Sequence, residues 1–152
     1  MEPKIVKLPK MMLVGVVGAA PEVSMIDIAS LWSRFAESSD RVAGAVEGAG
    51  YEFHEEVENS GVHLCLAGVQ VSKMSETPLG MVARVLPAST YAVFTHRVAD
   101  GYEATYERIE EWLEEADYAE AYPYDFQLYD SRFKGMGDPE SELDIYVPVM
   151  KD

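Results

Sequence analysis

Tyrosine and tryptophan are the side chains in this sequence with the clearest chemistry to offer a ligand. The chain has 9 Tyr and 2 Trp against 5 Phe, whereas a purely structural core would favour Phe. A ring face attracts a cation placed over it, and each such contact contributes about 0.5–2 kcal/mol. The composition therefore favours a pocket for cations, with ordinary core packing as the alternative for each ring. The aromatic set comprises Trp32, Tyr51, Phe53, Tyr91, Phe94, Tyr102, Tyr106, Trp112, Tyr129 and Tyr146.

The histidines and the cysteine are the next candidates for chemistry. His54, His63 and His96 are far apart in the sequence, and none lies at metal-ligand spacing from another histidine or from Cys65. We therefore expect no metal site. His63 and Cys65 alternate along one predicted strand, which makes a Cys–His nucleophile pair conceivable, although a buried, inert thiol is the favoured interpretation. His96 is either a polar group at the mouth of a cleft or a surface residue at a strand end.

Known catalytic and cofactor motifs do not appear in the sequence. Gly15 and Gly18 stand in an apolar run without the Lys-Ser/Thr that completes a phosphate-binding loop. A Gly-x-Ser-x-Gly nucleophile elbow is also missing from the sequence. We expect no cofactor.

The charge of the chain limits its partners. There are 12 Lys+Arg against 27 Asp+Glu, which gives a formal net charge of −15. This balance argues against direct nucleic-acid binding, which needs clustered basic residues, and against docking on anionic membranes. It suits a cationic ligand or a basic protein surface, with solubility alone as the alternative.

Cysteine usage and hydropathy indicate the compartment. A single cysteine allows no intramolecular disulfide, and no apolar run reaches the ~20 residues of a transmembrane helix. Three lysines precede the apolar run 11–20, a pattern typical of a short signal peptide. Because this run has a counterpart later in the chain, we interpret residues 5–18 as the first strand of the mature protein. The expected location is the cytoplasm.

The second half of the sequence echoes the first. Four segments recur in the same order, with offsets of 78, 78, 73 and 80 residues, which is typical of a degenerate tandem repeat. The matched pairs are Leu8-Pro9 with Leu86-Pro87, Leu31 and Phe35 with Ile109 and Leu113, Tyr51–His54 with Tyr124–Gln127, and Ala67–Val69 with Val147–Val149. We expect one domain over residues 1–152, with repeat units at about 1–73 and 80–152.

Each repeat unit is predicted to run strand, helix, strand, strand. Helical apolar spacing indicates helices that begin at Ser24 and at Asp100, each followed three residues later by an acidic residue, as in a capping box. Alternation and β-branched content predict the strands 12–17, 51–57, 62–71, 90–95, 124–129 and 143–149. Short turns between neighbouring strands give an α+β fold: a pseudo-two-fold antiparallel sheet with two main helices on one face.

In this order, several segments resemble one known family. They are Leu86-Pro87, Tyr91–His96, Tyr106–Leu113 with Trp112, Asp125–Asp130 and Ile145–Val149. Together they resemble the gyrase-inhibitor-like (GyrI-like) effector-binding domain, which occurs alone and as the ligand-binding domain of AraC-type and MerR-type transcription regulators. The resemblance implies a duplicated fold with a central cleft between the two helices that binds amphipathic, often cationic, molecules. Since no helix-turn-helix segment precedes the domain, we expect a stand-alone module.

One position departs from the family pattern. Many members carry a glutamate on the strand that matches 125–130, where it meets the positive charge of the ligand, and here Gln127 stands at that place. An amide can accept a hydrogen bond but cannot neutralise a cation. Glu56, the repeat partner of Tyr129, is the predicted substitute. The expected ligand-binding residues are Trp32, Tyr51, Phe53, Glu56, Tyr91, His96, Trp112, Gln127, Tyr129 and Tyr146.

Three classes of function follow from these observations. The favoured one is a module that binds small hydrophobic or amphipathic cations. The second is a hydrolase of reactive electrophilic toxins, an activity that the resemblance implies for some relatives and that would use Tyr129 and a carboxylate in the cleft. The third is an acidic inhibitor or regulator of a protein partner, and either a protein partner or a homodimer is possible.

Overall fold

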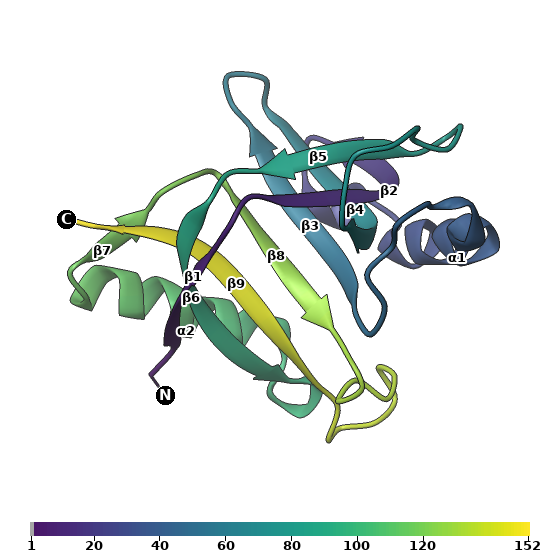
Figure 1. The fold of residues 1–152 in the computed structure, drawn as a ribbon. Helices are drawn as coiled ribbons and strands as arrows, with labels where there is room; N and C mark the ends of the chain where they lie inside the picture. Colours follow the sequence, from purple (N-terminus) through teal and green to yellow (C-terminus); the bar gives the residue numbers. More distant parts are fainter. Residues whose placement is uncertain (1) are drawn as a thin grey trace.

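The computed structural model describes residues 2–152 and contains one continuous antiparallel sheet. The strands are β1 (Lys4–Leu8), β2 (Met11–Ala20), β3 (Gly50–Val57), β4 (Val62–Val71), β5 (Val82–Leu86), β6 (Ser89–Arg97), β7 (Tyr118–Glu120), β8 (Tyr124–Tyr129) and β9 (Glu142–Lys151). They pair in the order β1-β6-β9-β8-β3-β4-β2-β5, and β7 pairs with β9 (Figure 1). Two helices, α1 (Ile28–Ser38) and α2 (Tyr102–Glu115), complete the described chain. The predicted α+β class is confirmed.

The two halves of the chain meet at the centre of the sheet, where β3 pairs with β8. Phe53 lies opposite Phe126, Glu52 opposite Gln127, and His54 opposite Asp125. Adding 73 (126 − 53) to a residue number of β3 gives its repeat partner in β8, so Glu52 corresponds to Asp125 and His54 to Gln127. The Glu52–Gln127 and His54–Asp125 pairs are therefore equivalent, as a two-fold axis through the Phe53–Phe126 pair requires. The outer strands also pair with strands of the other half of the chain: β1 pairs with β6, and β5 pairs with β2.

Some boundaries differ from those predicted from the sequence. Residues 5–18 are two strands and not one, since the chain turns at Pro9, which has no N–H to continue a ladder. β5 and β7 were not predicted. The first helix begins later than Ser24, because residues 23–25 form a 3₁₀ turn and Asp27 caps α1 by accepting the Ser30 N–H at 3.1 Å. The second begins at Tyr102, after a 3₁₀ turn over residues 98–100.

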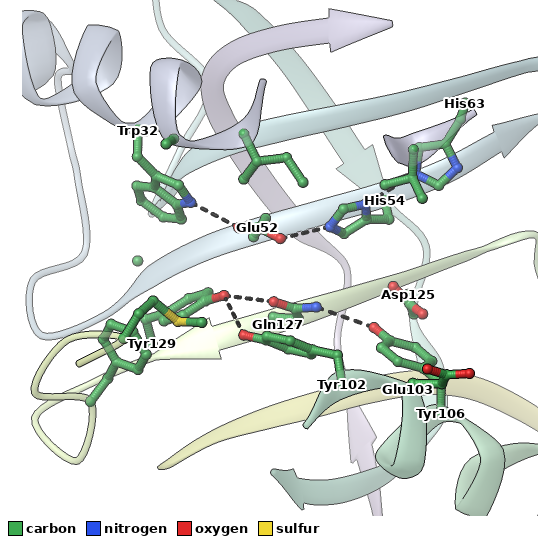
Figure 2. Close-up of a pocket in the computed structure, with 16 residues that line it drawn as sticks. Trp32, Glu52, His54, His63, Tyr102, Glu103, Tyr106, Asp125, Gln127 and Tyr129 are labelled. Carbon is green, nitrogen blue, oxygen red and sulfur yellow. Dashed lines mark hydrogen bonds and ion pairs between the residues drawn. The ribbon is translucent and has the colours of Figure 1, made fainter. Parts of the chain in front are cut away.

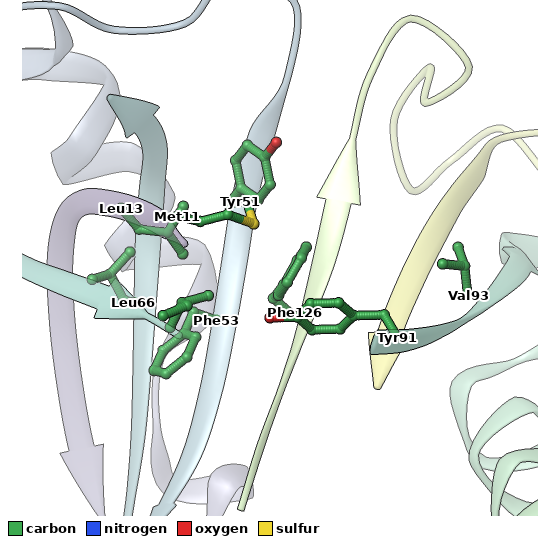
Figure 3. Packing of buried hydrophobic residues seen from close by; sticks show 9 residues of the cluster. Met11, Leu13, Tyr51, Phe53, Leu66, Tyr91, Val93 and Phe126 are labelled. Carbon is green, nitrogen blue, oxygen red and sulfur yellow. The ribbon is translucent and has the colours of Figure 1, made fainter. Parts of the chain in front are cut away.

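Both helices pack on the same face of the sheet, as predicted. Leu31 and Phe35 of α1 lie against apolar residues of β2 and β4, and Ile109 of α2 lies against residues of β6 and β9. The opposite face buries a cluster that contains Leu13, Phe53, Leu66, Tyr91, Val93 and Phe126 (Figure 3). Because side chains alternate along a strand, Tyr51 and Phe53 of β3 belong to this cluster, whereas Glu52 and His54 point to the face that carries the helices.

A pair of glycines lets β2 and β4 approach closely. Gly15 and Gly68 are register partners, and a Cβ added at Gly68 would lie 2.0 Å from the Val14 carbonyl oxygen. A Cβ at Gly15 would lie 2.2 Å from the Ala67 carbonyl oxygen. No side chain fits at either position, so both must be glycine. Within residues 2–152, none of the helices has both the length and the apolar character that a membrane span requires.

Candidate functional site

A cavity of about 990 Å³ opens on the helix face of the sheet, between α1 and α2 (Figure 2). It exists because α1 contacts β2 and β4, whereas α2 contacts β6 and β7. The two central strands, β3 and β8, therefore have no helix over them and form the floor of the cavity. Residues of both helices and of both strands line the cavity. The lining residues are Val23, Ile28, Ala29, Trp32, Gly50, Glu52, His54, His63, Tyr102, Glu103, Tyr106, Asp125, Gln127, Tyr129, Phe133 and Met136.

The wall next to α1 is a chain of charged and polar groups that starts at Trp32. The Trp32 Nε1–H donates to Glu52 Oε1 at 2.9 Å, and the second oxygen, Oε2, lies 2.7 Å from His54 Nε2. His54 Nδ1 in turn lies 3.0 Å from His63 Nε2. Glu52 is only 6% exposed, so its carboxylate is stabilised by these two partners rather than by water.

The protonation of the two histidines follows from their neighbours. Burial alone would lower the pKa of His54, but its hydrogen bonds with Cys65 and Glu52 raise it above the usual value. Burial and the charge of His54 lower the pKa of His63. At neutral pH His54 is therefore the imidazolium, which donates to Glu52 and to the neutral ring of His63. Glu52 and His54 form an internal ion pair.

Cys65 lies behind this wall, fully buried, with its Sγ 3.9 Å from His54 Nε2. Its histidine neighbour is therefore His54 and not His63. A catalytic Cys–His–acid triad needs the thiol and the carboxylate on different ring nitrogens, but here both approach Nε2. The arrangement does not support a nucleophilic cysteine.

The spacing argument against a metal site missed this cluster. Glu52, His54 and Cys65 each present one ligand atom, and these atoms lie within 4.8 Å of one another. His54 and Cys65 are register partners in the β3–β4 hairpin. Residues that are 11 positions apart in the sequence, 65 − 54, are thus neighbours across two strands.

The wall next to α2 is a network of neutral hydroxyl and amide groups. Tyr129 O–H donates to Gln127 Oε1 at 2.6 Å, and Gln127 Nε2 donates to the Tyr106 hydroxyl at 3.2 Å. The Tyr102 and Tyr129 hydroxyl oxygens are 3.4 Å apart. Burial raises the pKa of all three tyrosines above the usual value, so they stay protonated. Figure 2 shows this network facing the charged wall across the cavity.

Aromatic rings close one end of the cavity. Trp32 and Tyr129 meet edge to face, with ring centroids 5.6 Å apart, and join the two walls. Phe133 meets Tyr129 in the same way at 4.8 Å. Such pairs fix the ring orientations and leave their remaining faces toward the cavity.

Asp125 is the carboxylate of the cavity without a settled partner. Its Oδ1 is buried and makes no hydrogen bond, although the residue lines the cavity. Burial raises the pKa of Asp125 from 3.8 to about 6, while the positive charge of His54 and a hydrogen bond with Tyr106 act in the opposite direction. A buried oxygen without a partner is costly unless a ligand, ion or water meets it.

The structure brings together only part of the predicted site. Trp32, Gln127 and Tyr129 line the cavity. Four other predicted residues lie outside it, on the opposite face of the sheet, in or against the cluster shown in Figure 3: Tyr51, Phe53, Tyr91 and Tyr146. Tyr51 and Phe53 flank the cavity residue Glu52 along β3, but strand alternation points them to the other face.

Three further predicted residues lie elsewhere. Glu56 is exposed beside a second cavity near Tyr122 and Pro123, and not between the helices. His96 is neither at a cleft mouth nor on the surface: it is fully buried, with Nδ1 2.7 Å from Thr105 Oγ1. Trp112 packs edge to face on Phe94 and stacks on Tyr118, so these positions do not contribute to the cavity.

The polar lining residues that the prediction did not include are Glu52, His54, His63, Tyr102, Glu103, Tyr106 and Asp125. The signal for two of them was present in the sequence, because Glu52 and His54 share the strand face that is in step with Asp125 and Gln127. The two tyrosines belong to the apolar stripe of the second helix.

Comparison with known proteins gives matches along almost the whole chain. A family model described as integron-associated effector binding protein (Cass2) matches residues 4–149. The transcriptional regulator BrlR of Pseudomonas aeruginosa is 33% identical over 157 residues, which cover 98% of this chain and 56% of BrlR. The chain thus spans about half the length of this curated relative.

Solved structures show the same fold. The structure of SAV2435 bound to tetraphenylphosphonium superposes with a TM-score of 0.74 at 18% identity, covering 99% of this chain and 94% of that one. An integron cassette protein of Vibrio cholerae gives a TM-score of 0.67 at 13% identity, covering 98% of this chain and 96% of that one. At these identities the likeness concerns the fold.

Proposed function

The chain belongs to the integron-associated effector-binding protein family, of the GyrI-like type, and on this premise we propose that it binds amphipathic organic cations in the cavity between α1 and α2. The observation that carries the proposal is Asp125, a residue that lines the aromatic cavity and whose buried Oδ1 has no hydrogen-bond partner. An organic cation would add positive charge near this carboxylate without the need for a hydrogen-bond donor.

The charges around the cavity support this choice. Among the described residues, no lysine or arginine lines the cavity, whereas Glu52, Glu103 and Asp125 do. Glu52 is already paired with His54 at 2.7 Å and Glu103 is exposed, so Asp125 is the buried carboxylate available to a ligand. In a partly desolvated site an attraction between opposite charges is stronger than in water.

The rings of the cavity favour a bulky and apolar ligand. Trp32, Tyr102, Tyr106, Tyr129 and Phe133 surround the space. A volume of about 990 Å³ is at the upper end of the range for small-molecule sites. Tetraphenylphosphonium, the molecule bound by the structural relative SAV2435, has the combination of rings and delocalised charge that these walls would accept.

Gln127 has a different role from the glutamate of the family pattern. Its amide is held at both ends, by Tyr129 at 2.6 Å and by Tyr106 at 3.2 Å, and it carries no charge. We propose that Asp125, two residues earlier on the same strand face, takes over the electrostatic role. Glu56, the substitute expected from the sequence, is exposed outside the cavity.

The alternative functions have less support. A hydrolase that used Tyr129 as a nucleophile or general base would need its phenolate, whereas burial raises the pKa of Tyr129. An interaction with a basic protein would rest on the acidic face of α2 alone. A link to transcription, as in BrlR, and a cytoplasmic location stay predictions.

The test compares two ions of nearly the same shape. Tetraphenylphosphonium and tetraphenylborate both place four phenyl rings around one atom but carry opposite charges. Titration of wild-type protein followed by tryptophan fluorescence should show clear preference for the phosphonium. Asp125→Asn should weaken phosphonium binding by about tenfold to a hundredfold, that is, about 1.4–3 kcal/mol, while Glu56→Gln, the matched control on the exposed carboxylate, should not. Equal affinity of wild-type protein for both ions would refute cation selectivity.

A further inference from the structure

A second binding site can be built from the charged wall of the cavity. We propose that Glu52 Oε2, His54 Nε2 and Cys65 Sγ bind one zinc ion. The three atoms lie within 4.8 Å of one another and come from adjacent strands, β3 and β4. This site does not rest on the proposed binding of organic cations, which depends on Asp125.

The donor set is suited to zinc. Nitrogen, carboxylate oxygen and thiolate sulfur are the three donor types that Zn²⁺ uses in proteins, with bonds of about 2.0–2.1 Å to nitrogen and about 2.3 Å to sulfur. Around a tetrahedral ion these bond lengths place nitrogen and sulfur about 3.5 Å apart. The observed separation of His54 Nε2 and Cys65 Sγ is 3.9 Å, so an ion fits between them with a small movement.

Glu52 needs a larger adjustment. Its Oε2 lies 2.7 Å from His54 Nε2, because His54 donates a hydrogen bond to it. Two zinc ligands of this kind lie about 3.3 Å apart. When the ion replaces the proton, the carboxylate has to withdraw by about 0.6 Å, and it has room to do so because Glu52 lines the cavity.

The outer partners that orient metal ligands are already present. Trp32 Nε1–H donates to Glu52 Oε1 and leaves Oε2 for the ion. The N–H at His54 Nδ1 donates to His63 Nε2 at 3.0 Å. The other ring nitrogen of His54, Nε2, is therefore left for the ion. Metal-binding proteins hold their histidine and carboxylate ligands with hydrogen bonds of this kind.

The fourth coordination position would face the cavity. Glu52, His54 and His63 all line it, whereas Cys65 closes the site from the buried side. Water, or an oxygen, nitrogen or sulfur donor of a bound small molecule, would complete the tetrahedron. Three protein ligands with one open position distinguish such a site from a closed structural zinc site.

The test uses cobalt as a spectroscopic substitute for zinc. Wild-type protein, treated with a chelator and kept reduced, should give the near-ultraviolet band of thiolate-to-Co²⁺ charge transfer together with the visible bands of four-coordinate Co²⁺. Because the chain has one cysteine, the charge-transfer band reports Cys65 directly. One equivalent of Zn²⁺ should remove all of these bands.

Variants separate the proposed ligands from other donors. Cys65→Ala should abolish the charge-transfer band, and His54→Gln should abolish both sets of bands. His63→Ala should weaken zinc binding by about 10- to 100-fold, as expected for an outer partner, and the exposed Glu56→Gln should change nothing. Circular dichroism without metal checks that each variant is folded. If Co²⁺ gives no thiolate band with wild-type protein, or if the band persists in Cys65→Ala, the proposal is wrong, and this result would leave the binding of organic cations untouched.

Discussion

Replacing Asp125 by asparagine should stabilise the protein at neutral pH, although it weakens ligand binding. Burial raises the pKa of Asp125 from 3.8 to about 6, so the fold disfavours the ionised form. The shift is 6 − 3.8 = 2.2 pH units, and at about 1.4 kcal/mol per unit the ionised carboxylate costs up to about 3 kcal/mol at pH 7. An asparagine keeps the shape without the charge, so Asp125→Asn should raise the free energy of unfolding by an amount up to this value.

The pH dependence gives the sign of the effect. Between pH 4 and 6 the folded protein holds a proton on Asp125 that the unfolded chain has already released. The folded state therefore binds more protons, and this contribution to stability is present below pH 4 and is lost as the pH rises through 6. The stability difference between Asp125→Asn and wild type should be near zero at pH 4 and should grow toward pH 7.

Urea denaturation of chelator-treated protein at several pH values measures this difference. The matched control is Asp130→Asn, because hydrogen bonds from Arg132 lower the pKa of Asp130. That variant should be less stable than wild type at pH 7. Tetraphenylphosphonium at 100 times its wild-type Kd should narrow the stability gap between Asp125→Asn and wild type, since it adds about 2.7 kcal/mol to wild type and less to the variant, which binds it more weakly. An Asp125→Asn variant that is less stable at pH 7 than at pH 4, relative to wild type, would refute the reasoning.

Three more predictions concern the site and its frame. Gln127→Glu adds a charge to the cavity floor, so it should tighten phosphonium binding severalfold in titrations and lower the free energy of unfolding by about 1–3 kcal/mol in urea denaturation. Unchanged affinity would count against an electrostatic role for the floor. Tyr91→Phe removes the hydroxyl that lies 2.7 Å from the Tyr124 hydroxyl on the opposite face and should leave phosphonium affinity unchanged; a marked loss of affinity would show that this face takes part in binding. Gly68→Ala places a Cβ 2.0 Å from the Val14 oxygen and should destabilise the fold by about 3 kcal/mol or more in the same denaturation assay, whereas wild-type stability would disprove the close approach of β2 and β4.

Much of the fold follows from local pattern in the sequence. The bounds of β4, Val62–Val71, and of β8, Tyr124–Tyr129, agree with those predicted from alternation and turn residues. The edge strand β5, Val82–Leu86, was not predicted, because a five-residue segment beside a polar linker has little periodicity. Its place depends on pairing with β2, a contact between the two halves of the chain.

The site was harder to predict because it depends on strand parity and register. The predicted set mixed Tyr51 and Phe53 with Glu56, although odd and even residues of one strand face opposite sides of a sheet. The choice of Glu56 failed for another reason. The antiparallel pairing of β3 with β8 places Gly50 opposite Tyr129 and Glu52 opposite Gln127, so Glu56 lies beyond the end of the shared floor.

The polar cluster on the other wall is also a product of register. His54 and Cys65 become partners only when the β3–β4 hairpin closes around residues 58–61. Distance along the sequence, which was the basis for expecting no metal site, does not report such cross-strand neighbours. A prediction that included the register of the β3–β4 hairpin would have placed His54 and Cys65 side by side.

The most direct test of the central claim is a crystal structure of the protein with tetraphenylphosphonium. We expect the phosphorus atom to lie between α1 and α2, with phenyl rings against Trp32 and Tyr106 and with Asp125 as the nearest carboxylate that is not already in an ion pair. A phosphonium bound instead beside the exposed Glu56, or in the cavity with the Asp125 side chain turned away from it, would show that Asp125 does not attract the cation.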